Sequence, residues 1–185
     1  MKRILLSFLV VASCFVVKVN AQQISTNIDD SNTVREILHA VDTQVWQPFI
    51  LALQEGDNTA YTKVHAKDVL RISNDFIGIV QGGKAYFDRN EKTFASLKER
   101  KIEAKIEFAF ESRIVSKSLV SDQGYYRYTY GKAGETPKFI YGKFLVVSER
   151  KGSTWKIILD YDYTSQEDKY RISEADFQNA LRKMK

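Results

Sequence analysis

The chain has 185 residues, 44% of them hydrophobic, which is enough apolar content for one ordinary core, and we expect one domain. It contains 28 lysines and arginines, 23 acidic residues, one cysteine and two histidines. A single cysteine excludes an internal disulfide, and His39 and His65 would need carboxylates to complete a zinc site, so we expect no metal and no cofactor.

The N-terminal segment, residues 1–21, has the layout of a secretory signal peptide. A basic start precedes an apolar run from Ile4 to Val17, and small or polar residues lead to the expected cleavage after Ala21. The run is shorter than the ~20 apolar residues of a membrane span, so we expect export to the periplasm or the medium and no stable span. Alternatively, the residues before Cys14 resemble a bacterial lipoprotein cleavage box, which would acylate Cys14 and tether the protein.

Cleavage would also change the charge of the chain. It removes three basic residues and no acidic ones, so the sequence pI of 9.1 belongs mostly to the precursor. A nearly balanced mature chain lacks the strong basic character of nucleic-acid-binding proteins, and we expect no nucleic-acid partner.

The first half of the mature chain has helical periodicity. After a flexible lead-in at residues 22–31, Asn32 is the expected cap of a long helix that carries apolar residues on one side. Pro48 removes a backbone amide and should kink or break this helix near Gln47, and Gly56 should end it. A short helix at 58–64, a strand that begins at 69–72, and a helix at 84–101 follow.

From residue 102 onward the apolar residues alternate with polar ones, which is typical of half-buried antiparallel strands. Hairpin turns are expected at 121–124 and 151–153. Ser173 and Asp176 form an expected capping box for a last helix that ends near Met184. Helices followed by strands predict an α+β fold, with the N-terminal helices on one face of a curved antiparallel sheet. The strands are expected at residues 102–110, 112–120, 124–132, 138–150 and 153–164.

Several of these elements occur in an order that resembles a known group. They are the helix ending in Gly56-Asp57, the helix-to-strand segment Tyr61–Ile72, Gly82-Gly83 before the next helix, and the strand segments Gly142–Phe144 and Trp155–Ile157. Over residues 34–164 this order resembles the nuclear transport factor 2-like (NTF2-like) superfamily, on its ketosteroid isomerase and SnoaL-like polyketide cyclase side.

The resemblance implies a cone-shaped roll, with an apolar pocket at its open end and frequent dimerisation through the sheet. We therefore expect a cone-shaped domain at 32–164, a C-terminal helical extension at 165–185, and a homodimer. Members of this group include enzymes, binding domains and assembly modules, so the fold does not give the function.

Steroid isomerase chemistry by the known mechanism is disfavoured. Counted from the Gly-Asp turn, the family's catalytic tyrosine falls on Phe49, which has no donor, and its base falls on Ser73, which is a poor base. The acid donor falls near Leu145, on a segment without a carboxylate.

The same counting suggests other pocket residues. Two carboxylates, Asp160 and Asp162, share one face of a strand and could do acid–base chemistry if burial moved their pKa values apart. With Tyr128 and His65 they are the candidate catalytic groups. The candidate ligand-binding residues are Phe49, Tyr61, Tyr126, Tyr130, Tyr141, Lys143 and Ile158.

The alternation of residues along the strand does not decide which of its two faces points into the pocket. If Tyr161 and Tyr163 point inward, Asp160 and Asp162 are solvated, and even an inward Asp160 could form a structural pair with Lys143. His65 is expected in the loop before Asp68, at the pocket rim or on the surface.

Three functions remain open. The first is an exported domain that binds a small apolar or aromatic molecule. The second is a cofactor-independent lyase, cyclase or isomerase that works by proton transfer. The third is a homodimeric interaction module whose cone is filled by its own side chains.

Overall fold

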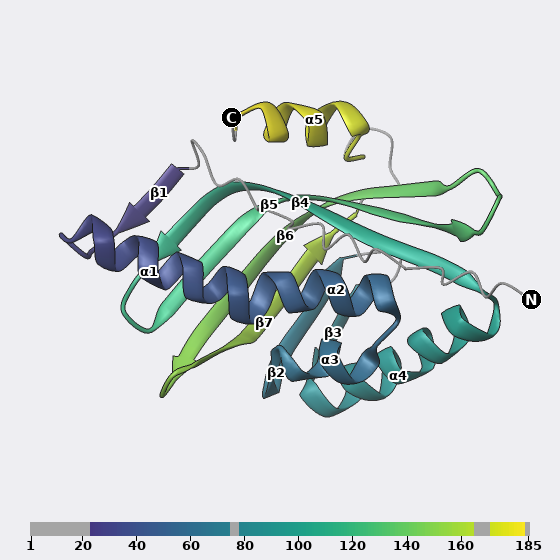
Figure 1. Ribbon diagram of the computed structural model, residues 1–185, viewed down its shortest axis with the longest axis horizontal. Helices are drawn as coiled ribbons and strands as arrows, with labels where there is room; N and C mark the ends of the chain where they lie inside the picture. The colour runs from purple at the N-terminus through teal and green to yellow at the C-terminus, as the bar shows by residue number, and fades with distance from the viewer. Residues whose placement is uncertain (1–22, 75–77, 165–170, 184–185) are drawn as a thin grey trace, which may run out of the picture.

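The computed structural model describes residues 23–74, 78–164 and 171–183, so the expected signal peptide at 1–21 lies outside the described residues. Figure 1 shows the elements in space. In chain order they are β1 (Gln23–Thr26), α1 (Ser31–Val41), the π-helical segment η1 (Asp42–Trp46), α2 (Gln47–Glu55), α3 (Asn58–Lys63), β2 (His65–Asn74), β3 (Ile79–Gly82), α4 (Gly83–Glu99), β4 (Ile102–Val115), β5 (Leu119–Lys132), β6 (Lys138–Lys151), β7 (Thr154–Tyr163) and α5 (Glu174–Lys183).

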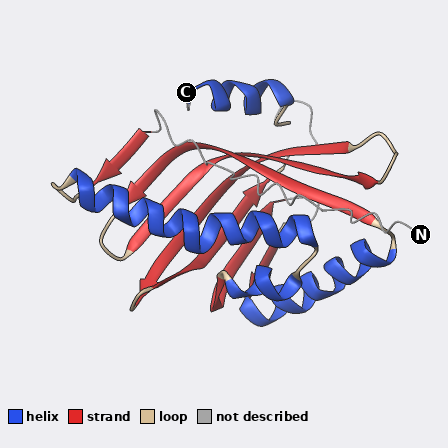
Figure 2. Cartoon of the chain, in the orientation of Figure 1, coloured by secondary structure: helices blue, strands red, loops and turns tan. Residues whose placement is uncertain are grey.

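The strands form one seven-stranded sheet in the order β1-β4-β5-β6-β7-β2-β3. Strands β4 to β7 pair antiparallel with their neighbours, whereas β1 pairs with β4, and β2 with β7, in parallel. Figures 1 and 2 show α1 to α4 on one face of this curved sheet and α5 on the other. The predicted α+β class, with N-terminal helices covering one face, is confirmed, and the sheet itself is mixed.

The long N-terminal helix is continuous but changes its winding before Pro48. Asp30, and not Asn32, caps it by accepting from the amides of Asn32 and Thr33. Segment η1 has π-helical winding and ends at Trp46, two residues before Pro48. Proline cannot donate an amide hydrogen and crowds the turn before it, so the predicted disturbance takes the form of a π-segment. The helix ends at Gly56, whose φ of 68° is left-handed.

Several boundary predictions are wrong. Strand β2, expected to begin at 69–72, already begins at His65, and β3 was not predicted. Residues 23–26 of the expected flexible lead-in form β1, which runs parallel to β4. The turn expected at 121–124 lies at 116–118, where Ser116 and Leu119 exchange hydrogen bonds. The polar residue that suggested the turn, Asp122, is fully buried on β5.

The core lies between the rod of α1, η1 and α2 and the inner face of the sheet. Trp46 packs edge-on against Phe108, Phe110 and Phe144 at centroid distances of 4.8 to 5.4 Å. Its indole donates to Asp122 at 2.7 Å.

A buried ion pair lies beside this tryptophan. Arg113 pairs with Asp122 through two hydrogen bonds of 2.7 and 3.1 Å, and with Asp42 of η1 at 2.8 Å. The ionic contacts therefore tie the helix rod to β4 and β5.

Helix α5 packs on the outer face, against β4 and β5. Ser173 and Asp176 exchange the predicted capping hydrogen bonds. Phe177 is buried, with its ring 6.2 Å from that of Tyr141 and 5.3 Å from the guanidinium of Arg127. In the described part of the chain no helix is long and apolar enough to cross a membrane.

Candidate functional site

A partly open cavity of about 610 Å³ lies on the inner face of the sheet, beside Leu53 of α2 and Tyr61 of α3. Its walls are mostly apolar and rich in aromatic residues, and the carboxylates of Asp160 and Asp162 also line it. The lining residues include Trp46, Tyr61, Phe108, Tyr126, Tyr128, Tyr141, Phe144, Asp160, Asp162, Arg171 and Ile172.

The parallel pairing of β2 and β7 builds the charged part of this cavity. In this register Arg71 lies beside Asp160, and Ser73 beside Asp162. A register irregularity at Ile158 shifts the alternation of β7, so that buried Ile157 and Asp160 are three residues apart.

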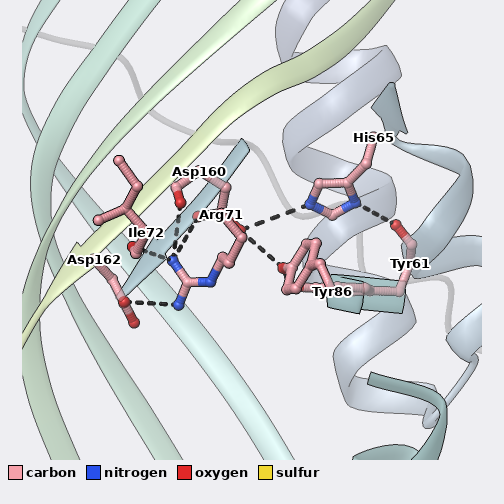
Figure 3. Close-up of polar contacts among 7 residues, drawn as sticks. All are labelled: Tyr61, His65, Arg71, Ile72, Tyr86, Asp160 and Asp162. Carbon is pink, nitrogen blue, oxygen red and sulfur yellow. Dashed lines mark hydrogen bonds and ion pairs between the residues drawn. The ribbon is translucent and has the colours of Figure 1, made fainter. Parts of the chain in front are cut away.

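Arg71 lies between the two carboxylates (Figure 3). Its Nη1 donates to the main-chain oxygens of Ile72 and Asp160 at 3.0 and 3.1 Å, and to Asp160 Oδ1 at 3.3 Å. Its Nη2 lies 2.7 Å from Asp162 Oδ1. The guanidinium is therefore directed at protein acceptors, and it holds both carboxylates in place.

A chain of hydrogen bonds reaches Asp160 from the other side (Figure 3). The Tyr86 hydroxyl donates to Asp160 Oδ2 at 2.9 Å, and the hydroxyls of Tyr61 and Tyr86 are 2.7 Å apart. Since the Tyr86 hydrogen is committed to the carboxylate, Tyr61 is the donor of that second bond.

His65 completes this arrangement from the start of β2. Its Nδ1 lies 2.8 Å from the carbonyl oxygen of Tyr61, and because a carbonyl only accepts, Nδ1 carries a hydrogen. Its Nε2 lies 3.8 Å from Asp160 Oδ2. His65 is fully buried behind Asp160, which corrects the prediction of a loop residue at the pocket rim.

The two carboxylates have pKa values displaced in opposite directions. Burial alone would raise the pKa of Asp160, but Arg71, His65 and Tyr86 outweigh it and hold the pKa well below its usual range. Burial does raise the pKa of Asp162, because the opposing contributions of Arg71 and Ser73 are smaller and the charge of Asp160 adds to the rise.

The tyrosines of the site stay neutral. Burial, with the negative charge of Asp160 or Asp162, raises the pKa of Tyr61, Tyr86 and Tyr126, and burial with Tyr130 raises that of Tyr128. The arrangement thus combines a fixed carboxylate, a second carboxylate suited to exchange a proton, and neutral hydroxyl donors.

The structure brings six of the predicted site residues to the cavity. They are Tyr61, Tyr126, Tyr128, Tyr141, Asp160 and Asp162. Tyr126 donates to Asp162 Oδ2 at 3.4 Å. Tyr141 borders the cavity while its ring contacts Phe177 on the outer face.

The other five predicted residues lie away from the cavity walls. Lys143 was predicted inward but is exposed, with its ammonium 4.8 Å from the ring of Tyr125, because it shares the outer face of β6 with Tyr141. Ile158 was predicted to share a face with Asp160, and the irregularity of β7 at this residue breaks that alternation. Like His65, Phe49 is buried, and Tyr130 borders a second cavity at the tip of the β5–β6 hairpin.

Sequence reasoning missed Arg71 and Tyr86. Arg71 alternates with Val69 and Ser73 along β2, and all three are buried, so an arginine on the apolar side of a strand was the available signal. Tyr86 lies two helical turns before buried Phe94 on α4, which is the corresponding signal for a helix. Within the described ranges, no group of three or more histidine, cysteine or acidic residues is arranged to hold a metal ion.

No protein-family model matches this sequence, and no curated protein matches it either. Solved structures are similar in fold. An NTF2-like protein of unknown function from Pseudomonas putida has a TM-score of 0.53 at 13% identity and covers 78% of this chain and 96% of that chain.

Two further structures have names that refer to enzymes. One titled a putative scytalone dehydratase, from Novosphingobium aromaticivorans, has a TM-score of 0.58 at 14% identity, covering 78% of this chain and 94% of that chain. A ketosteroid isomerase-like protein from Erwinia carotovora has a TM-score of 0.52 at 12% identity, covering 69% and 95%. The chain therefore has the NTF2-like fold, as the order of its elements predicted.

Proposed function

We propose that the cavity binds a small apolar or aromatic molecule and that Asp162 transfers a proton on it, as a cofactor-independent lyase, cyclase or isomerase would require. The observation that carries this proposal is the placement of two carboxylates in one apolar cavity, where Arg71 and Tyr86 hold Asp160 and Asp162 is more exposed. This difference in surroundings displaces their pKa values in opposite directions. Two acidic groups with separated pKa values are the usual basis of acid–base catalysis near neutral pH.

The roles follow from the contacts. Asp160 stays ionised and, with Arg71, fixes the position of its neighbour. Asp162 has a raised pKa and faces the cavity, so it is the better proton acceptor. Tyr128 borders the same cavity as a neutral donor, suited to stabilise an oxyanion that forms after proton removal.

The names of the similar structures support this class of reaction, since they include a dehydratase and a ketosteroid isomerase-like protein. The cavity volume of about 610 Å³ favours a ligand site over an interaction module with a filled cone. This is the range of volumes found for small-molecule sites.

The proposal includes export and a homodimer. Export is supported by the signal-peptide pattern at residues 1–21, and the N-terminal sequence of the mature protein tests it, because cleavage should leave Gln22 first.

A homodimer formed through the sheet would use the part of the outer face that α5 leaves uncovered. Sedimentation equilibrium at micromolar concentration tests it, and a monomer would count against the interface.

A nitrobenzisoxazole is a direct probe of the proposed proton transfer. A base removes its ring C–H proton, the released electron pair forms a nitrile, and the N–O bond breaks to give a coloured phenolate. Asp162→Asn should lower the rate roughly 100-fold or more, the usual contribution of a general base. Asp68→Asn, an exposed change on the neighbouring strand β2, is the matched control and should leave the rate unchanged. Equal rates in wild type and Asp162→Asn would contradict the proposed role.

A further inference from the structure

Only some of the charged residues near the cavity line its wall. Asp160 and Asp162 line the cavity, whereas Arg71, which lies between them and balances one of their two charges, is not among the lining residues. The cavity therefore offers carboxylate acceptors to a ligand, and Arg171 is also among its lining residues.

Most donors next to the two carboxylates are directed at protein oxygens; the exception is the Nε of Arg71, which is buried without a hydrogen-bond partner. Arg71 directs Nη1 at three oxygen atoms of Ile72 and Asp160, and Nη2 at Asp162. The hydroxyl hydrogens of Tyr61 and Tyr126 are directed at Tyr86 and at Asp162.

Asp162 retains the most acceptor capacity. The Arg71 contact engages Oδ1, while the Tyr126 hydroxyl reaches Oδ2 only at 3.4 Å, which is long for an O–H···O hydrogen bond. The side chain of Asp162 is 24% exposed, against 11% for Asp160. A purely apolar ligand would strip the water from this carboxylate and give it no donor in return.

We propose that the ligand is an aromatic or alicyclic molecule that carries an O–H or N–H donor, directs this donor at Asp162, and bears no carboxylate of its own. This inference rests on the proposed function, because it assigns the substrate class of the same cavity. The walls suit a flat apolar body, since Trp46, Phe108 and Phe144 present rings at T-shaped angles around one end of it. A ligand anion placed beside Asp162 would instead meet two carboxylates that share the single guanidinium of Arg71.

Four naphthalene derivatives that share one apolar body test the proposal by titration calorimetry. They carry a hydroxymethyl, an aminomethyl, a methyl or a carboxylate group. The alcohol and the amine should bind roughly 10-fold or more tightly than the methyl compound, the value expected for one hydrogen bond to a charged acceptor. The carboxylate should bind more weakly than the methyl compound.

Variants of Asp162 and its neighbours test whether Asp162 causes the preference for ligands with an O–H or N–H donor. In Asp162→Asn the alcohol should lose its advantage over the methyl compound, and the rejection of the carboxylate should diminish. Asp68→Asn, as the matched control, should keep the wild-type order. Tyr126→Phe is a second variant that removes the hydroxyl next to Asp162 Oδ2, and it should increase the advantage of the alcohol.

Three results would overturn the proposal: a carboxylate that binds as tightly as the alcohol, an order of affinities that Asp162→Asn and Tyr126→Phe both leave unchanged, or no binding of any of the four. Nitrobenzisoxazole carries no O–H or N–H donor and so separates the two proposals. Turnover that depends on Asp162 without a donor preference would refute the ligand class and leave the proton transfer standing.

Discussion

Replacement of Arg71 by methionine should strongly destabilise the protein. The guanidinium lies 3.3 Å from Asp160 and 2.7 Å from Asp162, and its loss leaves two carboxylates side by side in a largely buried site. Removing one partner of a buried ion pair costs about 3–5 kcal/mol. Because Asp160 keeps the Tyr86 hydroxyl and Asp162 is partly exposed, we expect a loss near the lower end, ~3 kcal/mol.

The pH dependence identifies the cause of this loss. In the wild type the folded pKa of Asp160 lies below its unfolded value, so its stabilising contribution is present above the unfolded value and is lost as the pH falls through the folded one. Without Arg71, burial and mutual repulsion should raise the folded pKa values of Asp160 and Asp162 above the unfolded ones. The variant then gains stability as the pH falls, and its deficit should shrink between about pH 7 and about pH 4.

Urea unfolding at both pH values measures these free energies. Adding Asp160→Asn to Arg71→Met should recover part of the loss, because it removes one of the two unbalanced charges. Arg35→Met, at an exposed position on α1, is the control and should change stability by less than ~0.5 kcal/mol. An Arg71→Met protein within ~1 kcal/mol of wild type, or a deficit that grows on acidification, would refute the reasoning.

Three further predictions concern the surroundings of the site. Tyr86→Phe removes a buried donor to Asp160 and should cost ~1–3 kcal/mol in thermal unfolding with little change in ligand affinity, since Tyr86 does not border the cavity; an unchanged stability would contradict it. Phe177→Ala should cost ~3 kcal/mol and weaken binding of the naphthalene alcohol, because Arg171 and Ile172, just before α5, line the cavity; a stability loss with unchanged affinity would make α5 purely structural. Gly124→Ala should cost ~1–3 kcal/mol, because its Cβ would lie 2.1 Å from a carbonyl oxygen of β4. The matched change Gly82→Ala meets nothing within 4 Å, and equal unfolding midpoints for these two glycine variants would contradict the steric argument.

The sequence was sufficient for the class of the fold because its periodicities are local. Helical spacing predicted the long N-terminal helix, and alternation predicted the strands from residue 102 onward, because both patterns depend on neighbouring residues. The prediction failed where a polar residue is buried by a distant partner. Asp122 was taken for a turn residue, but Arg113 and Trp46 bury its carboxylate within a strand.

The charged site was less accessible to sequence reasoning. Alternation placed Asp160 and Asp162 on one face, and the structure places both in the cavity. Their partner, Arg71, is 89 positions away from Asp160 and reaches it through a parallel strand pairing that no local pattern reveals. The irregularity at Ile158 is equally invisible to alternation, which assumes a regular strand.

The separation of the two aspartate pKa values is the central claim, and nuclear magnetic resonance titration of the side-chain carboxyl carbons tests it most directly. The ordinary pKa of an aspartate is 3.8. Asp160 should titrate below this value and Asp162 above it, with Asp160→Asn and Asp162→Asn assigning the two signals. Indistinguishable pKa values, or a reversed order with Asp160 above Asp162, would contradict the proposed division of roles.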